Sequence, residues 1–232
     1  MKAGKIILHV GLIAIIIVLG ILVYNSIVTP MRFEDECIAR RDACAEKLKA
    51  IRTLQEAHKM VYGCYAADLD SLVINLQQGK QPVVKKETLK VLPEDKEGMS
   101  EAEQIKQGYI RRDTVFMNPI QKLREEKKLY KIDSQGDTVE FTDQDLLEIK
   151  YVPVKAKEGE PRLEFTSNAG MVERGGFQVP VFEVKVDLMD LLWDLDEQSV
   201  INKIADIERV SGKYAGWKVG SMDEPITDGN FE

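Results

Sequence analysis

The side chains that most often carry acid–base or nucleophilic chemistry are few in this chain and widely spaced. There are two histidines, His9 and His58, and none follows residue 58. A Ser-His-Asp triad and a histidine-rich zinc site both need imidazole groups, so the C-terminal part of the chain lacks the materials for either. We therefore expect a non-enzymatic protein with no catalytic residue, no cofactor and no bound metal.

Two short patterns come closest to a metal site. His58 is followed by Cys64, but two ligands are too few for a four-coordinate zinc ion, and His58 is interpreted as a surface residue. The segment 133–137 begins and ends with aspartate, but it lacks the regular acidic spacing and the closing glutamate of a calcium-binding loop. A solvated turn is the expected structure there.

The three cysteines are Cys37, Cys44 and Cys64, and an odd number outside the cytoplasm leaves one thiol free or pairs it between chains. Cys37 and Cys44 are seven residues apart in a predicted helix, which places them on one face about 10 Å apart. That separation is too large for a disulfide between them. Two interpretations remain open: both are small buried residues, or they form a disulfide between two parallel helices of two chains.

Several aromatic residues lie beside glycine or near predicted helix ends. Tyr62, Tyr65, Tyr214 and Trp217 are candidates for a recognition surface, because exposed aromatic side chains are enriched at the centres of protein interfaces. The alternative is that they pack in the core. Tyr62, Tyr65 and Trp217 are therefore possible interaction residues, together with Cys37 and Cys44.

An uncharged apolar run extends from Ile6 to Tyr24. Its length approaches the roughly 20 residues that a helix needs to cross the hydrocarbon core of a membrane. A secretory signal peptide would have a shorter apolar region followed by a small-residue cleavage site, and no such site follows Tyr24. We expect a permanent transmembrane helix over residues 6–26, in contact with the lipid bilayer, after a cytoplasmic tip at residues 1–5.

Charge around this run predicts its orientation. Lys2 and Lys5 precede it, and positive residues favour the cytoplasmic side. Arg32, Arg40 and Arg41 lie on the other side and count against this orientation. The expected topology is a single-pass protein of the inner (cytoplasmic) membrane, with a cytoplasmic N-terminus and the bulk of the chain in the periplasm.

The overall charge limits the partners. The 232-residue chain has a formal net charge of −7, from 32 basic and 39 acidic residues. Without the two lysines before the apolar run, 30 basic residues (32 − 2) face 39 acidic ones. Binding of nucleic acid phosphates relies on clustered Lys and Arg, so we expect no nucleic acid partner.

A long helix should follow the membrane span. Pro30 is expected to interrupt the helix register, and no Pro or Gly occurs from Met31 to Val61. Gly63 suits a helix end, and Asp68 or Asp70 can cap a short second helix. Residues 31–79 are thus predicted to form a stalk helix and a short second helix, followed by a mixed connecting region at residues 80–145.

The last segment, residues 146–232, is predicted to be an α+β domain. Strands are expected at 146–154, 162–166, 177–188 and 214–219, with an amphipathic helix from Asp196 to a stop at Gly212. Alternation of apolar and charged residues in the third strand indicates a sheet with one buried face. The predicted fold class is α+β: an N-terminal transmembrane helix and long stalk helix, then an antiparallel sheet with helices on one face.

Residues 45–76, with a helix running into Gly63-Cys64-Tyr65 and then a short Leu-rich helix, resemble type II secretion pseudopilins and type IV pilins. The apolar run lacks the Gly-Phe cleavage site and the early glutamate of that family, which favours a permanent anchor. The segments 108–114, 179–183 and 213–221 are similar to a group of single-span membrane proteins of Bacteroidota. That resemblance implies location and lineage and supplies no catalytic residues.

The predicted function is a periplasmic structural or assembly component of an envelope machine, such as a secretion or type IV pilus-like system. Its expected partners are the bilayer, other envelope proteins and, through the stalk helix, a second copy of itself. The alternatives are a pseudopilin-like filament subunit and an envelope ligand-binding module.

Overall fold

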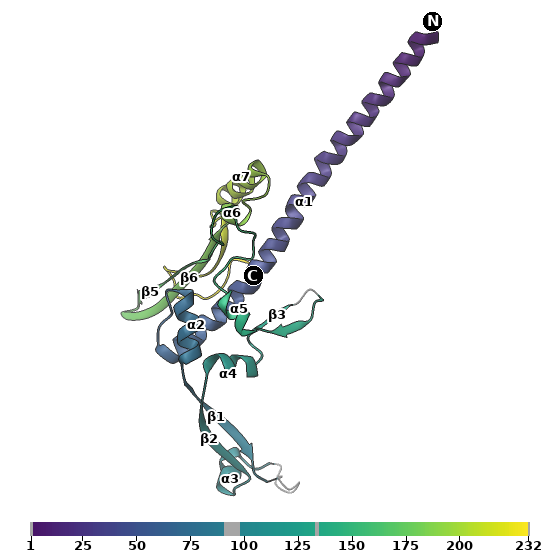
Figure 1. Cartoon of the computed structure of the whole chain (residues 1–232). Helices are drawn as coiled ribbons and strands as arrows, with labels where there is room; N and C mark the ends of the chain where they lie inside the picture. Colours follow the sequence, from purple (N-terminus) through teal and green to yellow (C-terminus); the bar gives the residue numbers. More distant parts are fainter. Residues whose placement is uncertain (1, 91–97, 133–134, 232) are drawn as a thin grey trace.

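The computed structural model describes residues 2–90, 98–132 and 135–231, and its fold is α+β. A single helix, α1 (Lys2–Tyr62), projects from a folded body that contains the remaining elements (Figure 1). The first half of α1 contains a stretch long and apolar enough to cross a membrane, and its side chains from Gly11 to Ile27 are all exposed. The predicted candidate span is therefore present.

The interruption expected at Pro30 is wrong, because α1 continues through this residue without a break. A proline inside a helix removes one backbone hydrogen bond, but helix propagation is cooperative and the flanking turns are intact on both sides. The predicted membrane helix and stalk helix are consequently one element.

The second half of α1 packs into the body through the narrow apolar stripe that the sequence contains. Its side chains at Cys44, Leu48, Ile51 and Leu54 are fully buried. α1 ends at Gly63, whose φ of 76° lies in the left-handed region that favours glycine. Both the buried stripe and this helix end agree with the prediction.

Helix α2 (Leu69–Gln78) follows the turn and packs on α1 through four buried side chains. Asp68 is its N-cap, because its carboxylate accepts a hydrogen bond from the Ser71 N–H at 2.8 Å. The short second helix expected from the sequence is thereby confirmed.

Three antiparallel strands form the main sheet, in the order β5 (Thr166–Arg174), β6 (Phe177–Asp187) and β7 (Gly216–Gly220). Alternate residues Phe182, Val184 and Val186 of β6 are buried against the rest of the body. On the opposite face Glu183 pairs with Lys185 and Lys218 at 3.1 and 3.0 Å. The sheet therefore has one apolar and one charged face, as the alternation predicts.

Smaller elements complete the body. Two hairpins are β1 (Gln81–Thr88) with β2 (Ile110–Met117) and β3 (Tyr130–Ile132) with β4 (Thr138–Glu140). The short helices are α3 (Glu101–Lys106), α4 (Pro119–Glu125), α5 (Asp143–Leu147), α6 (Leu188–Leu191) and α7 (Glu197–Asp206), and a π-helical turn (Ile207–Ser211) extends α7. Figure 1 shows the β1–β2 hairpin projecting away from the body and α7 at the end nearest the free half of α1.

The strand predicted at residues 146–154 is wrong. Thr142 and Asp145 form a reciprocal capping box, with the Thr142 N–H donating to the Asp145 carboxylate at 2.8 Å, and this starts α5 instead. Leu146 is buried as part of helix α5. In place of the two strands expected at 146–154 and 162–166, one isolated β-bridge joins Tyr151 and Glu164. The Thr142–Asp145 capping box thus determines a helix where the apolar pattern predicted a strand.

Candidate interaction groove

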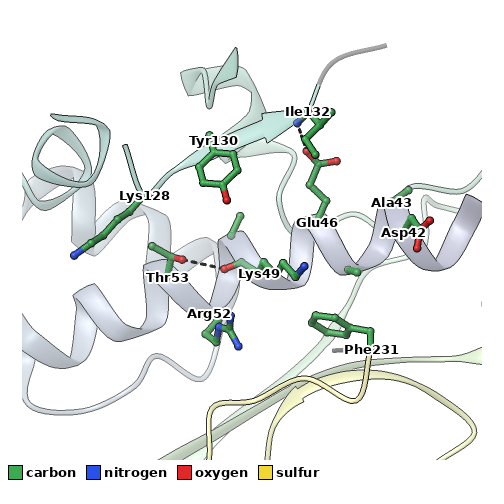
Figure 2. Close-up of a pocket in the computed structure, with 12 residues that line it drawn as sticks. Asp42, Ala43, Glu46, Lys49, Arg52, Thr53, Lys128, Tyr130, Ile132 and Phe231 are labelled. Atoms are coloured by element: carbon green, nitrogen blue, oxygen red, sulfur yellow. Dashed lines mark hydrogen bonds between the residues drawn. The ribbon is translucent and has the colours of Figure 1, made fainter. Parts of the chain in front are cut away.

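A groove runs along one side of α1. It has a volume of about 710 Å³, and its floor is the α1 segment from Asp42 to Thr53. One wall is β3 with its preceding turn, and the other is Phe231 near the C-terminal end (Figure 2). Three segments far apart in the sequence therefore meet at this site.

The floor of the groove carries three small residues of α1. Ala43, Ala45 and Ala50 line it, and their short side chains leave space between the helix and the two walls. Tyr130 and Ile132 point to the same side of β3, since side chains two apart in a strand share a face. Both are more than half exposed, which gives the groove an apolar wall open to a partner.

One hydrogen bond fixes β3 over α1. The Glu46 carboxylate accepts a hydrogen bond from the backbone N–H of Ile132. On the other wall the Lys49 ammonium lies 6.0 Å from the centre of the Phe231 ring, within the range of a cation–π contact. The two walls are thus each held by one charged side chain of α1.

The charges of the groove are separated along its length. Asp42 and Glu46 lie at the end nearer the apolar half of α1, while Lys49 and Arg52 lie at the other end with Lys128. Their positions on α1 span about 15 Å by the helical rise. The lining charges are therefore separated along the groove, and two of them already have partners: Asp42 pairs with Arg41 at 2.8 Å and Lys128 with Glu126 at 2.7 Å.

This arrangement is suited to holding a polypeptide segment. Ligand pockets are usually enclosed and lined mainly by apolar side chains with a few convergent polar groups, whereas this groove is open and its charges diverge. No group of three or more His, Cys, Asp or Glu side chains that could hold a metal ion occurs in the described ranges.

The two cysteines predicted to share a helix face do so, and both are buried. Burial raises the pKa of the Cys44 thiol to about 12, and burial likewise raises the pKa of Cys37. Cys44 is fully covered by its own chain, so a disulfide from it to a second chain would require local unfolding. Cys64 is partly exposed, and all three thiols are free. The geometry favours the interpretation as small core residues.

The candidate aromatic residues do not form one surface. Tyr65 is buried with its ring centre 4.6 Å from that of Phe182. Trp217 faces the core from β7, and its buried indole N–H lacks a hydrogen-bond partner among the described residues. Tyr62 is 45% exposed, and its hydroxyl donates to the Asn75 carbonyl at 2.9 Å. Tyr62 therefore connects the end of α1 to α2, whereas Tyr65 packs against the main sheet.

His58 is buried, so its interpretation as a surface residue is wrong. Its Nδ1 lies 2.8 Å from the Cys64 carbonyl oxygen and its Nε2 lies 3.3 Å from the Asn75 side-chain nitrogen. A neutral ring that donates from Nδ1 and accepts at Nε2 satisfies both contacts. The expected turn at 133–137 falls partly on residues 133 and 134, which lie outside the described residues.

The sequence patterns missed Tyr130, Ile132 and Phe231 as groove residues. Residues 121–131 lie in the predicted mixed connecting region, and their many charges favour a solvated helix or loop. The alternating Tyr130 and Ile132 are nevertheless a short strand signal. No local signal places Phe231 beside α1, because that contact depends on the tertiary fold.

Comparison with known proteins gives no match to a family model, to a curated protein or to a solved structure.

Proposed function

We propose that this chain is a non-enzymatic, membrane-anchored assembly component of a bacterial envelope machine, and that the groove along α1 binds a segment of another envelope protein. The observation that carries the proposal is the continuity of α1. The same helix provides an exposed apolar half, compatible with a bilayer, and the floor of the open groove. A partner bound there is held at a fixed height above the membrane.

The proposed location is the inner membrane, with the folded body in the periplasm. Lys2 and Lys5 precede the apolar stretch and favour a cytoplasmic N-terminus. Fusion of a reporter that is active only outside the cytoplasm to the C-terminus tests this orientation. Activity of that fusion is expected, and activity only of a cytoplasmic reporter would contradict it.

The groove supports the proposal through its length and charge. A floor of about 15 Å accommodates two to three turns of a helix, and recognition of a helix in a groove commonly uses side chains on one face. The complementary segment would place basic residues near Asp42 and Glu46 and acidic residues near Lys49 and Arg52. Charge complementarity of this kind determines register and partner choice.

Crosslinking in intact cells, followed by identification of the crosslinked proteins, tests the proposed function. Recovery of secretion or pilus proteins with the chain is expected. Recovery of the chain alone would contradict a role in a larger assembly and would favour a homo-oligomer. Extraction of the membranes with alkaline carbonate is the companion measurement, since a peripheral protein is released by it and a spanning one is retained.

A second candidate is a pseudopilin-like filament subunit, favoured by the charge pattern of α1 itself. In a parallel copy shifted by fourteen residues, about 21 Å by the helical rise, Arg32 faces Glu46 and Asp35 faces Lys49. Mass spectrometry of the mature protein distinguishes the candidates. A peptidase-processed N-terminus favours the filament subunit, and a start at Met1 or Lys2 favours the permanent anchor.

A further inference from the structure

The position of α7 relative to α1 is fixed by two contacts. The Arg40 guanidinium donates to Asp194 at 2.9 Å just before α7, and the Lys203 ammonium donates to Glu34 at 2.7 Å near its end. Glu34 precedes Arg40 by six residues on α1, which is about 9 Å nearer the apolar half. α7 therefore runs antiparallel to α1, toward the candidate membrane span (Figure 1).

The π-helical turn that extends α7 forms the tip at this end of the body. Val210 in this turn is 77% exposed, the highest value among the exposed large apolar side chains of the described structure. Arg209 and Lys213 flank it, and neither has an ion-pair partner within the described ranges. Glu208 and Asp206 are close in sequence, so the segment carries no net charge.

The position of this tip along the axis of α1 can be compared with the expected position of the membrane surface. Val210 follows Lys203 by seven residues, so along the direction of α7 it lies about 10 Å beyond the Lys203–Glu34 contact, level with about Val28 of α1. Val28 is half-buried, whereas every other described side chain from Gly11 to Arg32 is exposed. The α1 helix is thus partly covered at the height expected for the tip.

That height falls in the lipid headgroup layer. Residues 6–31 of α1 contain no Asp, Glu, Lys or Arg, and at 1.5 Å per residue they are longer than the roughly 30 Å hydrocarbon core. A core that begins at Ile6 ends near Asn25, with Tyr24 at the interface where tyrosine is enriched. Val28 then lies about 5 Å above the hydrocarbon, inside the headgroup layer.

A second groove opens at the same end of the body. It has a volume of about 540 Å³ and lies between the α1 residues Thr29 and Arg32 and the loop that contains Lys155. Arg32 is exposed and has no ion-pair partner in the described part of the chain. Glu36, Asp194 and Asp196 line the part of this groove farther from the candidate span, so it is the Arg32 end that would meet a phospholipid phosphate.

We propose that this end of the body docks on the bilayer surface, with Val210 inserted among the lipid headgroups and Arg32, Arg209 and Lys213 directed at lipid phosphates. The apolar side chain and its flanking cations match the composition of membrane-interface segments. Because α1 tethers the tip to the membrane, a small contact area is sufficient to orient the body. This inference rests on the membrane anchor of the proposed function.

The experiment places an environment-sensitive fluorophore on single accessible cysteines of the full chain reconstituted in liposomes, in a Cys64→Ala background in which the remaining Cys37 and Cys44 are buried. The variants are Val210→Cys at the tip, Leu19→Cys within the span and Met60→Cys at the far end of α1, 26 residues beyond Glu34. Nitroxide-labelled lipids are expected to quench the Val210→Cys probe at least about twofold more than the Met60→Cys probe, and to quench Leu19→Cys as well.

The controls separate the possible failures. Equal quenching at Val210→Cys and Met60→Cys, with quenching at Leu19→Cys, overturns the docking and leaves the anchor intact. A blue-shifted Val210→Cys emission without lipid quenching also overturns it, because the tip is then covered by protein. Absence of quenching at Leu19→Cys overturns the anchor and the docking together.

Discussion

The side-chain amide of Gln55 forms two hydrogen bonds with the backbone of Ala66. Its Nε2 donates to the Ala66 carbonyl at 2.7 Å, and its Oε1 accepts from the Ala66 N–H at 2.9 Å. Gln55 is fully buried in the apolar stripe of α1, so this pair connects the end of the helix to the turn that leads into α2. A polar residue in the stripe therefore fixes the chain reversal on which α2 depends.

We expect Gln55→Leu to lower the free energy of unfolding by about 2 kcal/mol or more, because it leaves both backbone groups of Ala66 buried without partners. Urea unfolding of the full chain in detergent, followed by tryptophan fluorescence, measures this loss. Met60→Gln, at an exposed position five residues later, is the matched control and should change stability by less than about 0.5 kcal/mol. Equal stability of the two variants would contradict the role of the pair.

The second prediction concerns the pH dependence of the Arg40–Asp194 pair. The hydrogen bond from Arg40 lowers the pKa of Asp194 in the folded protein. The pair therefore contributes stability above the pKa of the unfolded chain, about 3.9, and loses it as pH falls through the lower folded-state pKa. The stability difference between the wild type and Asp194→Asn should be constant from about pH 8 to pH 5 and shrink below about pH 4.

Asp113→Asn provides the control for this titration. Asp113 pairs with Arg111 at 3.6 Å, and both side chains are about 60% exposed, so the substitution should have little effect on stability at any pH. Denaturant unfolding at a series of pH values measures both variants. If the stability difference between the wild type and Asp194→Asn grew as the pH falls, this result would contradict the predicted role of the Arg40–Asp194 pair.

The third prediction concerns thiol reactivity. With a pKa of about 12, Cys44 carries about one thiolate in ten thousand molecules at pH 8, and its side chain is covered. Iodoacetamide should modify Cys64 in the folded protein and reach Cys44 only after denaturation. Peptide mass spectrometry of samples labelled before and after addition of urea measures this order. A Cys44-dependent dimer on a non-reducing gel would show instead that two copies meet at this helix face.

The fourth prediction compares two glycines with positive φ, of which only one is also crowded by neighbouring atoms. Gly220 in β7 has a φ of 76°, and a Cβ there would lie 2.3 Å from the Phe182 carbonyl oxygen. Gly136 has a similar φ of 86° but open space around it. Gly136→Ala should cost about 1 kcal/mol from the backbone conformation alone, and Gly220→Ala should cost more because the sheet must also move. Thermal unfolding of both variants makes the comparison.

Local signals in the sequence predicted those elements that local interactions determine. The Gly63 helix end, the Asp68 cap, the strand β6 and the helix stop at Gly212 each follow from a few neighbouring residues. The α+β class followed from their order. The interruption expected at Pro30 does not occur, because the cooperativity of a long helix outweighs the local cost of one proline.

The groove was not predictable in the same way. Its walls depend on contacts between residues far apart in the chain, such as Glu46 with Ile132 and Lys49 with Phe231. The same holds for His58, whose partners Cys64 and Asn75 become close only when α2 folds back on α1. Tertiary structure, and not residue type, determines which of these side chains are buried.

The most direct test of the central claim is photo-crosslinking from the groove in intact cells. A photo-activatable amino acid replaces Lys49 in the groove or Met171 on β5, which is 54% exposed and lies outside it. We predict that the Lys49 position gives a discrete adduct with an envelope protein in the membrane fraction and that the Met171 position does not. Equal or absent adducts at the two positions would contradict the proposal that the α1 groove binds a partner.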